Sequence, residues 1–208
     1  MISDSIIIEI FCSLDDFMKE FNSILQKNSV SDGSTTKKRN RKFKMSDSEV
    51  MTILVIFHLK SYRNLKHFYL NHICKYRQDM FPDCVSYNRF VELQKKVTQP
   101  LAVFMKMNCL GDCTGISFID STPLKVCHYK REKQHQVFKD IAKKSYGTMG
   151  WYFGFKLHIV CNDKGEIIDF MFTPANVDDR FPLKQKKFHD KLFGKIFGDK
   201  GYIGKDLF

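Results

Sequence analysis

The sequence predicts a mixed protein of the α+β or α/β class, in which an N-terminal helical module precedes a domain built on a mixed β-sheet. Apolar residues recur every three or four positions up to about residue 107, which is the period of an amphipathic helix. After Gly111 they form short runs or alternate with polar residues, which is the pattern of strands. The chain has 208 residues, of which 43% are hydrophobic, so it is long enough to bury a core in one domain or two small ones.

Three segments make up the helical part. Residues 1–27 carry one apolar stripe and predict an amphipathic N-terminal helix. Residues 28–45 are rich in Ser, Thr, Gly and Asn and then in Lys and Arg, which indicates a basic linker. Ser46 and Glu49 have the spacing of a capping box, so we expect a helix to begin there. It would open a helical module for DNA binding or dimerisation over residues 46–110.

Further helices of this module are predicted over residues 62–76 and 85–107, the second interrupted near Pro100 because proline lacks the N–H that a helix interior uses. The basic and aromatic residues of the module have two interpretations. They could line a DNA-facing surface, or the aromatic ones could belong to the core, as aromatics at helical spacing more often do. These residues are Arg63, Lys66, His67, Tyr69, His72, Lys75, Tyr76 and Arg77.

The second domain is expected over residues 115–208. Its predicted elements are, in order, a buried strand over 116–120, a strand over 151–161, a turn over 162–165, a returning strand over 166–172, a helix over 181–192 and a strand over 195–198. Asp178 and Asp179 are placed to cap the helix. The strand over 151–161 alternates strictly, with Lys156 and His158 on one face, which is typical of a half-buried strand. Its apolar face comprises Trp151, Phe153, Phe155, Leu157, Ile159 and Cys161.

Two of the predicted strands deliver an aspartate at their C-terminal ends, Asp120 and Asp199. A hairpin followed by a crossover helix brings the last strand beside the first in parallel, so the two carboxylates are expected to be neighbours. Adjacent carboxylates repel each other unless a cation lies between them, and oxygen ligands suit Mg²⁺ or Mn²⁺. A metal site that cleaves phosphodiesters is one interpretation of this pair, and ordinary capping of strand ends is the other.

The balance of charge favours a polyanionic partner. Lys and Arg number 34 against 23 acids, which gives a formal net charge of +11. The cations concentrate in the linker and directly after Asp120, where they could contact DNA phosphates, and one follows Asp199. The predicted DNA-binding residues are Lys37, Lys38, Arg39, Arg41, Lys42, Lys125, His128, Lys130, Arg131, Lys133, Lys143, Lys144 and Lys200.

A few residues remain secondary candidates for the site. Asn176, Asp178 and Asp179 lie in a polar loop, where a turn role competes with a place near the metal, and Tyr202 could pack or stack on a base. The seven cysteines are odd in number and scattered, which favours a reducing cytoplasm over a disulfide framework. No run approaches the roughly 18 apolar residues that a membrane span needs, so no membrane partner is expected.

Several ordered motifs resemble one known family. They are FIDSTPL from Phe118, GTMGWYFGFKLHIV from Gly147, TPANVDDR from Thr173 and GDKGYI from Gly198, and SDSEV from Ser46 adds a weaker one. Together they resemble the DDE transposases of bacterial insertion sequences, specifically the insertion-sequence 982 family. The resemblance covers about 80% of the chain.

The resemblance implies an RNase H-like catalytic domain in which Asp120 and Asp199 are the first two catalytic and metal-binding acids. It further implies two Mg²⁺ or Mn²⁺ ions in the intact enzyme, terminal-repeat and target DNA as partners, a homo-oligomer, and a cytoplasmic, nucleoid-associated location. A third acid, a glutamate on a later helix, has no match here, and Glu166 and Asp206 are poor substitutes. The expectation is therefore an incomplete, C-terminally truncated domain, either a transposase that requires completion or a non-catalytic DNA-binding remnant that inhibits an intact one.

Overall fold

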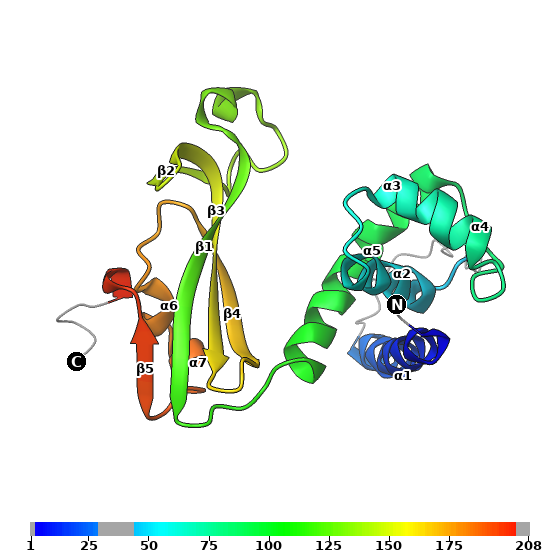
Figure 1. Ribbon diagram of the computed structural model, residues 1–208, viewed down its shortest axis with the longest axis horizontal. Helices are drawn as coiled ribbons and strands as arrows, with labels where there is room; N and C mark the ends of the chain where they lie inside the picture. The colour runs from blue at the N-terminus through cyan, green and yellow to red at the C-terminus, as the bar shows by residue number, and fades with distance from the viewer. Residues whose placement is uncertain (1–2, 29–43, 203–208) are drawn as a thin grey trace. The chain divides into compact units, whose positions relative to one another are not determined.

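The computed structural model describes residues 3–28 and 44–202, and its chain divides into two compact units. The helical unit comprises Met1–Met107 and the sheet unit comprises Asn108–Phe208. Figure 1 shows the helices of the first and the strands of the second. Over the described part of the chain, no helix combines the length and apolar character that crossing a membrane would require.

The helical unit consists of α-helices and one π-helical segment. Their bounds are α1 Asp4–Asn28, α2 Asp47–Leu59, α3 Leu65–His67, the π-helix η1 Phe68–Ile73, α4 Cys74–Tyr76 and α5 Tyr87–Asn108. The predicted capping box begins α2: the Glu49 N–H donates to Ser46 Oγ at 3.1 Å, and the Ser46 N–H donates to Glu49 Oε2 at 2.6 Å. The interruption predicted near Pro100 is wrong. α5 continues through this buried proline, because its apolar face stays packed although one helical hydrogen bond is lost.

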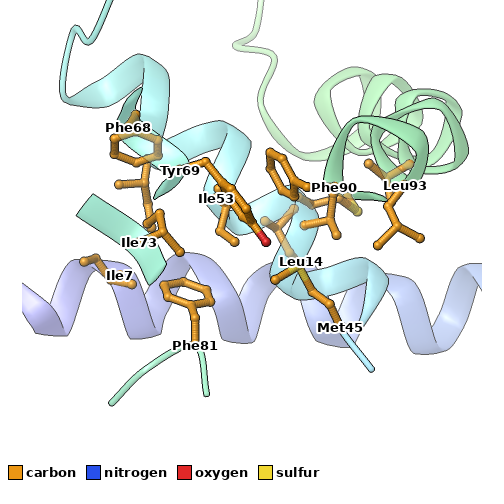
Figure 2. Close-up of a cluster of buried hydrophobic side chains, with 14 of the residues drawn as sticks. Ile7, Leu14, Met45, Ile53, Phe68, Tyr69, Ile73, Phe81, Phe90 and Leu93 are labelled. Carbon is orange, nitrogen blue, oxygen red and sulfur yellow. The ribbon is translucent and has the colours of Figure 1, made fainter. Parts of the chain in front are cut away.

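One hydrophobic core holds the helical unit together (Figure 2). Ile7 and Leu14 of α1 are buried in the same cluster as Ile53 of α2 and Phe90 of α5. The Tyr69 ring stacks on Phe90 with centroids 4.1 Å apart, and its hydroxyl donates to the Val85 carbonyl at 2.7 Å. Tyr69 is therefore a core residue, which settles its two interpretations in favour of packing.

The sheet unit carries a five-stranded mixed sheet. Its elements are β1 Ile116–His128, the 3-10 helix η2 Tyr129–Gln134, β2 Lys143–Gly147, β3 Gly150–Asn162, β4 Ile167–Pro174, α6 Phe181–Lys184, α7 Lys186–His189, β5 Lys195–Gly198 and the 3-10 helix η3 Lys200–Tyr202. β3 pairs antiparallel with β1 on one side and with β2 and β4 on the other, and β5 runs parallel to β1 (Figure 1). The predicted hairpin and parallel last strand are confirmed, whereas β2 was not predicted.

The helix predicted over residues 181–192 is wrong in its continuity. Gln185 has extended backbone angles and separates α6 from α7. The cap predicted for it is also wrong: Arg180 is the N-cap residue of α6, and no side chain caps that end. Asp178 turns the chain before the helix instead of capping it, because its carboxylate bonds only two residues ahead.

Over most of its length, β3 buries the face that was predicted to be polar, and not the face that was predicted to be apolar. His158, Val160 and Asn162 are buried, because the core formed by Ile119, Val160 and Phe188 lies on their face, under α7. The apolar residues of the other face, Leu157, Ile159 and Cys161, are only half-buried. Phe153 is an exception on that face, since His135, from the segment between η2 and β2, packs against it.

The second face of the sheet is apolar and open. Register places Phe118, Phe197 and Phe172 on it, with exposed fractions of 49%, 51% and 58%. Phe118 and Phe197 stack with ring centroids 5.6 Å apart. Asp120 lies on this same face, because it pairs with Ile159 of β3. The sheet unit therefore has a covered face, packed under α6 and α7, and an open face that carries Asp120.

Candidate functional site

The parallel pairing of β1 with β5 brings the two predicted acids to the same edge of the sheet. The register runs from Ile116 opposite Lys195 to Ile119 opposite Gly198. Asp120 and Asp199 are the next residues after this pairing, so they occupy adjacent positions beside the C-terminal end of β5. The prediction that the first strand ends at Asp120 is wrong: β1 continues to His128, because it also pairs with β3 beyond this point. Gly198 makes this approach possible, since a Cβ there would lie 2.8 Å from Ile119 Cγ2.

Both acids are exposed, and each accepts a backbone hydrogen bond from a residue that follows it closely in the sequence. The Ser121 N–H donates to Asp120 Oδ1 at 2.7 Å, and the Gly201 N–H donates to Asp199 Oδ1 at 3.3 Å. These bonds orient one oxygen of each carboxylate and leave the other toward solvent. The edge therefore presents two anionic oxygen donors, which are hard ligands of the kind that Mg²⁺ and Mn²⁺ prefer.

A third acid, Asp179, lies on the covered face of the sheet. Its Oδ1 accepts from Ser121 Oγ at 3.0 Å and from Lys156 Nζ at 2.9 Å. Lys156 also donates to the Val177 carbonyl at 2.9 Å, which ties the loop before α6 to β3. Because side chains alternate along a strand, Ser121 and Asp120 leave β1 on opposite faces, and Asp179 is held on the face away from Asp120.

The hydroxyl of Tyr202 lies close enough to carboxylates on both faces of the sheet to be affected by their charges. Burial raises the pKa of the Tyr202 hydroxyl to about 12, and the negative charges of Asp179, Asp120 and Asp199 raise this pKa as well. All three carboxylates thus act on one hydroxyl in η3, directly after Asp199. Tyr202 is buried in the core of the sheet unit, so packing is its observed role.

Beneath this edge, His158 forms a buried hydrogen-bonded row. Its Nε2 lies 2.9 Å from Thr173 Oγ1 and its Nδ1 lies 3.3 Å from the Tyr202 hydroxyl. The side chain has no solvent exposure, and burial lowers the pKa of the imidazole below its usual 6.5. The row fixes Tyr202, and through it the turn that begins at Asp199.

Because His158 is buried, we expect the stability of the sheet unit to depend on pH. The unfolded chain binds a proton near pH 6.5, whereas the folded sheet unit resists protonation, so its stability should fall as the pH drops below about 6.5. Trp151, the only tryptophan, reports unfolding of this unit by fluorescence. In urea titrations at about pH 7.5 and about pH 5.5, His158→Gln should reduce the loss of stability. The exposed His189→Gln is the matched control and should retain the full loss.

The loop before α6 lines a cleft of about 530 Å³ within the sheet unit. Three cations, Lys156, Arg180 and Lys200, contribute to its wall. Asp178 forms a turn in which its Oδ1 accepts from the Arg180 N–H at 2.8 Å, and the Arg180 side chain keeps the pKa of this carboxyl well below its usual range. Asn176 lines the same cleft and is exposed. Of the secondary candidates, Asp179 accepts a hydrogen bond from Ser121, the residue of β1 that follows Asp120.

The predicted DNA-binding residues fall into three groups. Lys37, Lys38, Arg39, Arg41 and Lys42 lie outside the described residues. Lys200 lies in the turn after Asp199. The others follow the end of β1, η2 and the start of β2, and all of them are at least partly exposed: Lys125, His128, Lys130, Arg131, Lys133, Lys143 and Lys144.

The alternative acids are placed less favourably. Glu166 lies in the turn after β3, where its carboxylate accepts from Asn162 Nδ2 at 2.7 Å. Asn162 pairs with Ser117, three residues before Asp120 on β1. Asp206 lies outside the described residues. Within residues 3–28 and 44–202, no group of three or more His, Cys, Asp or Glu side chains is arranged to hold a metal ion.

Comparison with known proteins identifies one domain. Residues 110–208 match the family model described as a transposase DDE domain. Neither the curated proteins nor the solved structures contain a significant match. The matched segment includes β1 and β5 with both aspartates, and it covers nearly all of the sheet unit. By sequence, the sheet unit is therefore similar to the DDE domain of transposases.

Proposed function

We propose that this chain is a transposase of the insertion-sequence 982 type, and that Asp120 and Asp199 are two acids of a metal site for DNA strand cleavage and strand transfer. The observation that carries the proposal is the register of β1 and β5, which makes the two aspartates neighbours at one sheet edge. The match of residues 110–208 to a transposase DDE domain supports the same reaction.

The residues at this edge suit a divalent cation. Asp120 and Asp199 would hold it through carboxylate oxygens, and each is already oriented by a backbone N–H. Bound Mg²⁺ or Mn²⁺ supplies a polarised phosphoryl oxygen and an activated water or 3′-hydroxyl. Lys200, in the turn after Asp199, would hold a DNA phosphate near the metal edge. Insertion-sequence ends and target DNA are the proposed partners, and a homo-oligomer is the proposed assembly.

A third carboxylate belongs to the proposed site. Glu166 is a poor source, because it hydrogen-bonds to Asn162, which pairs with Ser117 three residues before Asp120 and shares the covered face of the sheet. Asp179 is held by Ser121 and Lys156 on the covered face. No residue within 3–28 or 44–202 is therefore proposed as the third metal ligand. DNA binding without cleavage is the competing function, in which the chain occupies element ends and inhibits an intact transposase.

The salt dependence of DNA binding tests the assignment of the basic residues. Neutralising Lys130, Lys133 and Lys143 to Gln should weaken binding of a labelled duplex and reduce the log–log salt slope by about 0.9 for each phosphate that the variant no longer neutralises. A control that neutralises Lys164, Lys187 and Lys195 removes the same charge elsewhere on the sheet unit and should leave the slope unchanged. If the two sets of substitutions had equal effects, Lys130, Lys133 and Lys143 would contribute only through the net charge of the protein, and their assignment as DNA contacts would be wrong.

Adding Mg²⁺ to the protein and supercoiled plasmid then separates the two functions. Nicking that depends on the metal supports the strand-cleavage function. Binding without nicking supports the DNA-binding alternative. If neither binding nor nicking occurs, the proposal that this chain acts on DNA is wrong.

A further inference from the structure

The hairpin of β2 and β3 exposes large apolar side chains at its tip. Trp151 is 50% exposed, Tyr146 is 67% exposed, and Met149, in the turn between the strands, is 83% exposed. Tyr146 and Trp151 are cross-strand partners whose rings meet edge to face, with centroids 5.3 Å apart. Large apolar side chains grouped on one exposed surface indicate a partner for them.

The side chain of Lys144 lies over two aromatic rings, those of Trp151 and Tyr129. Lys144 Nζ is 4.5 Å from the centroid of Trp151 and 5.0 Å from that of Tyr129. Tyr129, Lys144, Tyr146 and Trp151 together form what we call the aromatic platform. The lysine contacts the Trp151 and Tyr129 rings, and Tyr146 lies directly opposite Trp151 across the strand pair.

The surroundings of the platform are strongly basic. Between Lys125 and Trp151 the sequence contains seven Lys or Arg residues and two acids, Glu132 and Asp140. This segment therefore contributes +5 of the formal net charge of +11. An apolar protein surface or a second copy of this basic hairpin would not complement that charge, whereas a nucleic-acid strand offers both phosphates and flat aromatic faces.

We propose that the aromatic platform stacks on an unpaired DNA base, while Lys144 and the surrounding cations bind the adjoining phosphates. The inference rests on the proposed function in one respect, that the partner is DNA. It adds that the DNA is recognised where it is unpaired or distorted. A stacked base gains affinity on any sequence, because every base has an aromatic face.

The sheet limits the distance between the aromatic platform and the proposed metal site at Asp120 and Asp199. Trp151 and Ile159 share one face of β3, and Ile159 pairs with Asp120. Eight residues of strand span at most about 26 Å, which corresponds to about eight nucleotides of a DNA strand. The unpaired base should therefore lie within about eight nucleotides of the strand held at Asp120 and Asp199.

Trp151 provides its own reporter, because it is the only tryptophan of the chain. The full-length protein is titrated with a labelled duplex that carries one extrahelical adenine and with the fully paired duplex of the same length. Anisotropy of the label measures binding, and Trp151 fluorescence measures stacking. We expect quenching by the extrahelical-base duplex and much weaker quenching by the paired one.

Substitutions separate stacking from charge. Trp151→Leu and Tyr146→Leu should each weaken binding of the extrahelical-base duplex by about tenfold and leave the paired duplex within about twofold. Phe193→Leu, an exposed aromatic beside the start of β1, should change neither affinity. Circular dichroism checks that all three variants fold, and Trp151→Phe should recover most of the affinity because it retains a flat ring.

The outcomes are distinct from those that test the proposed function. Binding of both duplexes with equal affinity and unchanged Trp151 fluorescence would overturn the stacking proposal and leave DNA binding intact. A Trp151 signal that depends on protein concentration without DNA would overturn it in favour of self-association. Absence of DNA binding would overturn both proposals.

Discussion

Asp120→Asn and Asp199→Asn are each expected to lower the affinity of the protein for Mn²⁺ at least about tenfold and to abolish any metal-dependent DNA cleavage. Each substitution keeps the size and the hydrogen-bonding geometry of the side chain but removes one anionic ligand from the sheet edge. Free Mn²⁺, measured by electron paramagnetic resonance during a protein titration, gives the affinity directly. This readout does not require the chain to be catalytically active.

The same variants should differ from wild type in stability in a way that depends on the metal. Without metal, removing one of two neighbouring carboxylates relieves their repulsion and should raise the thermal midpoint of the sheet unit. With Mg²⁺, wild type should gain stability by mass action and the variants should not. Asp190→Asn, an exposed acid at the end of α7, is the control. Unchanged Mn²⁺ affinity in Asp120→Asn or Asp199→Asn would contradict the metal assignment. All three variants should still bind DNA.

Gly154→Ala should destabilise the sheet unit by about 3 kcal/mol or more. A Cβ at residue 154 would lie 2.0 Å from the Leu124 carbonyl oxygen, and this neighbour is backbone that cannot rotate away. Gly154 pairs with Lys125 of β1 and Lys143 of β2, so relief of the clash must separate β3 from β1, the strand that carries Asp120. Urea unfolding followed through Trp151 fluorescence measures the effect on this unit.

Gly147→Ala is the matched control for that substitution. Gly147 is also a strand glycine of the sheet unit, but a Cβ there would meet Tyr152 at an ordinary 3.5 Å. We expect a change within about 0.5 kcal/mol. If both substitutions had the same small effect, the close approach of Gly154 to the Leu124 carbonyl would be wrong. The pairing of β1 with β3 at this point would then be wrong as well.

The order of elements around the candidate site could be predicted from local patterns. The alternation over 151–161, the turn residues at 162–165 and the short apolar run before Asp199 each depend on neighbouring residues. The hand of the crossover connection then places the last strand beside the first. The capping box at Ser46 is equally local, and it is present in the structure. These features required no knowledge of the tertiary packing.

The side chains around the aspartates were less predictable, because their roles depend on which sheet face is covered. His158 was assigned to the polar face, yet it is the buried one, because the face with Leu157 and Ile159 remains open. Once His158, Ser121 and Lys156 are placed on a covered face, each needs a hydrogen-bond partner, and Thr173, Tyr202 and Asp179 provide them. Polar residues at alternate positions 156 and 158 of β3 were the available signal.

The two short helices illustrate the same limit. Apolar spacing over 181–192 is consistent with one helix, and Phe188 and Leu192 do reach the core. The break at Gln185 results from tertiary fit, since Leu183 of α6 and Phe188 of α7 both pack against the covered face. Propensity alone does not resolve such a break.

Iron-mediated cleavage of the protein backbone tests most directly whether Asp120 and Asp199 share one metal site. Fe²⁺ bound in place of Mg²⁺, with ascorbate and peroxide, generates hydroxyl radicals that cut the chain close to its ligands, and mass spectrometry locates the cuts. We expect cuts both in the part of β1 near Asp120 and in the turn near Asp199, suppressed together by excess Mg²⁺ and by either Asp→Asn substitution. Cuts at only one of these positions, or cuts that persist in both variants, would contradict a shared site.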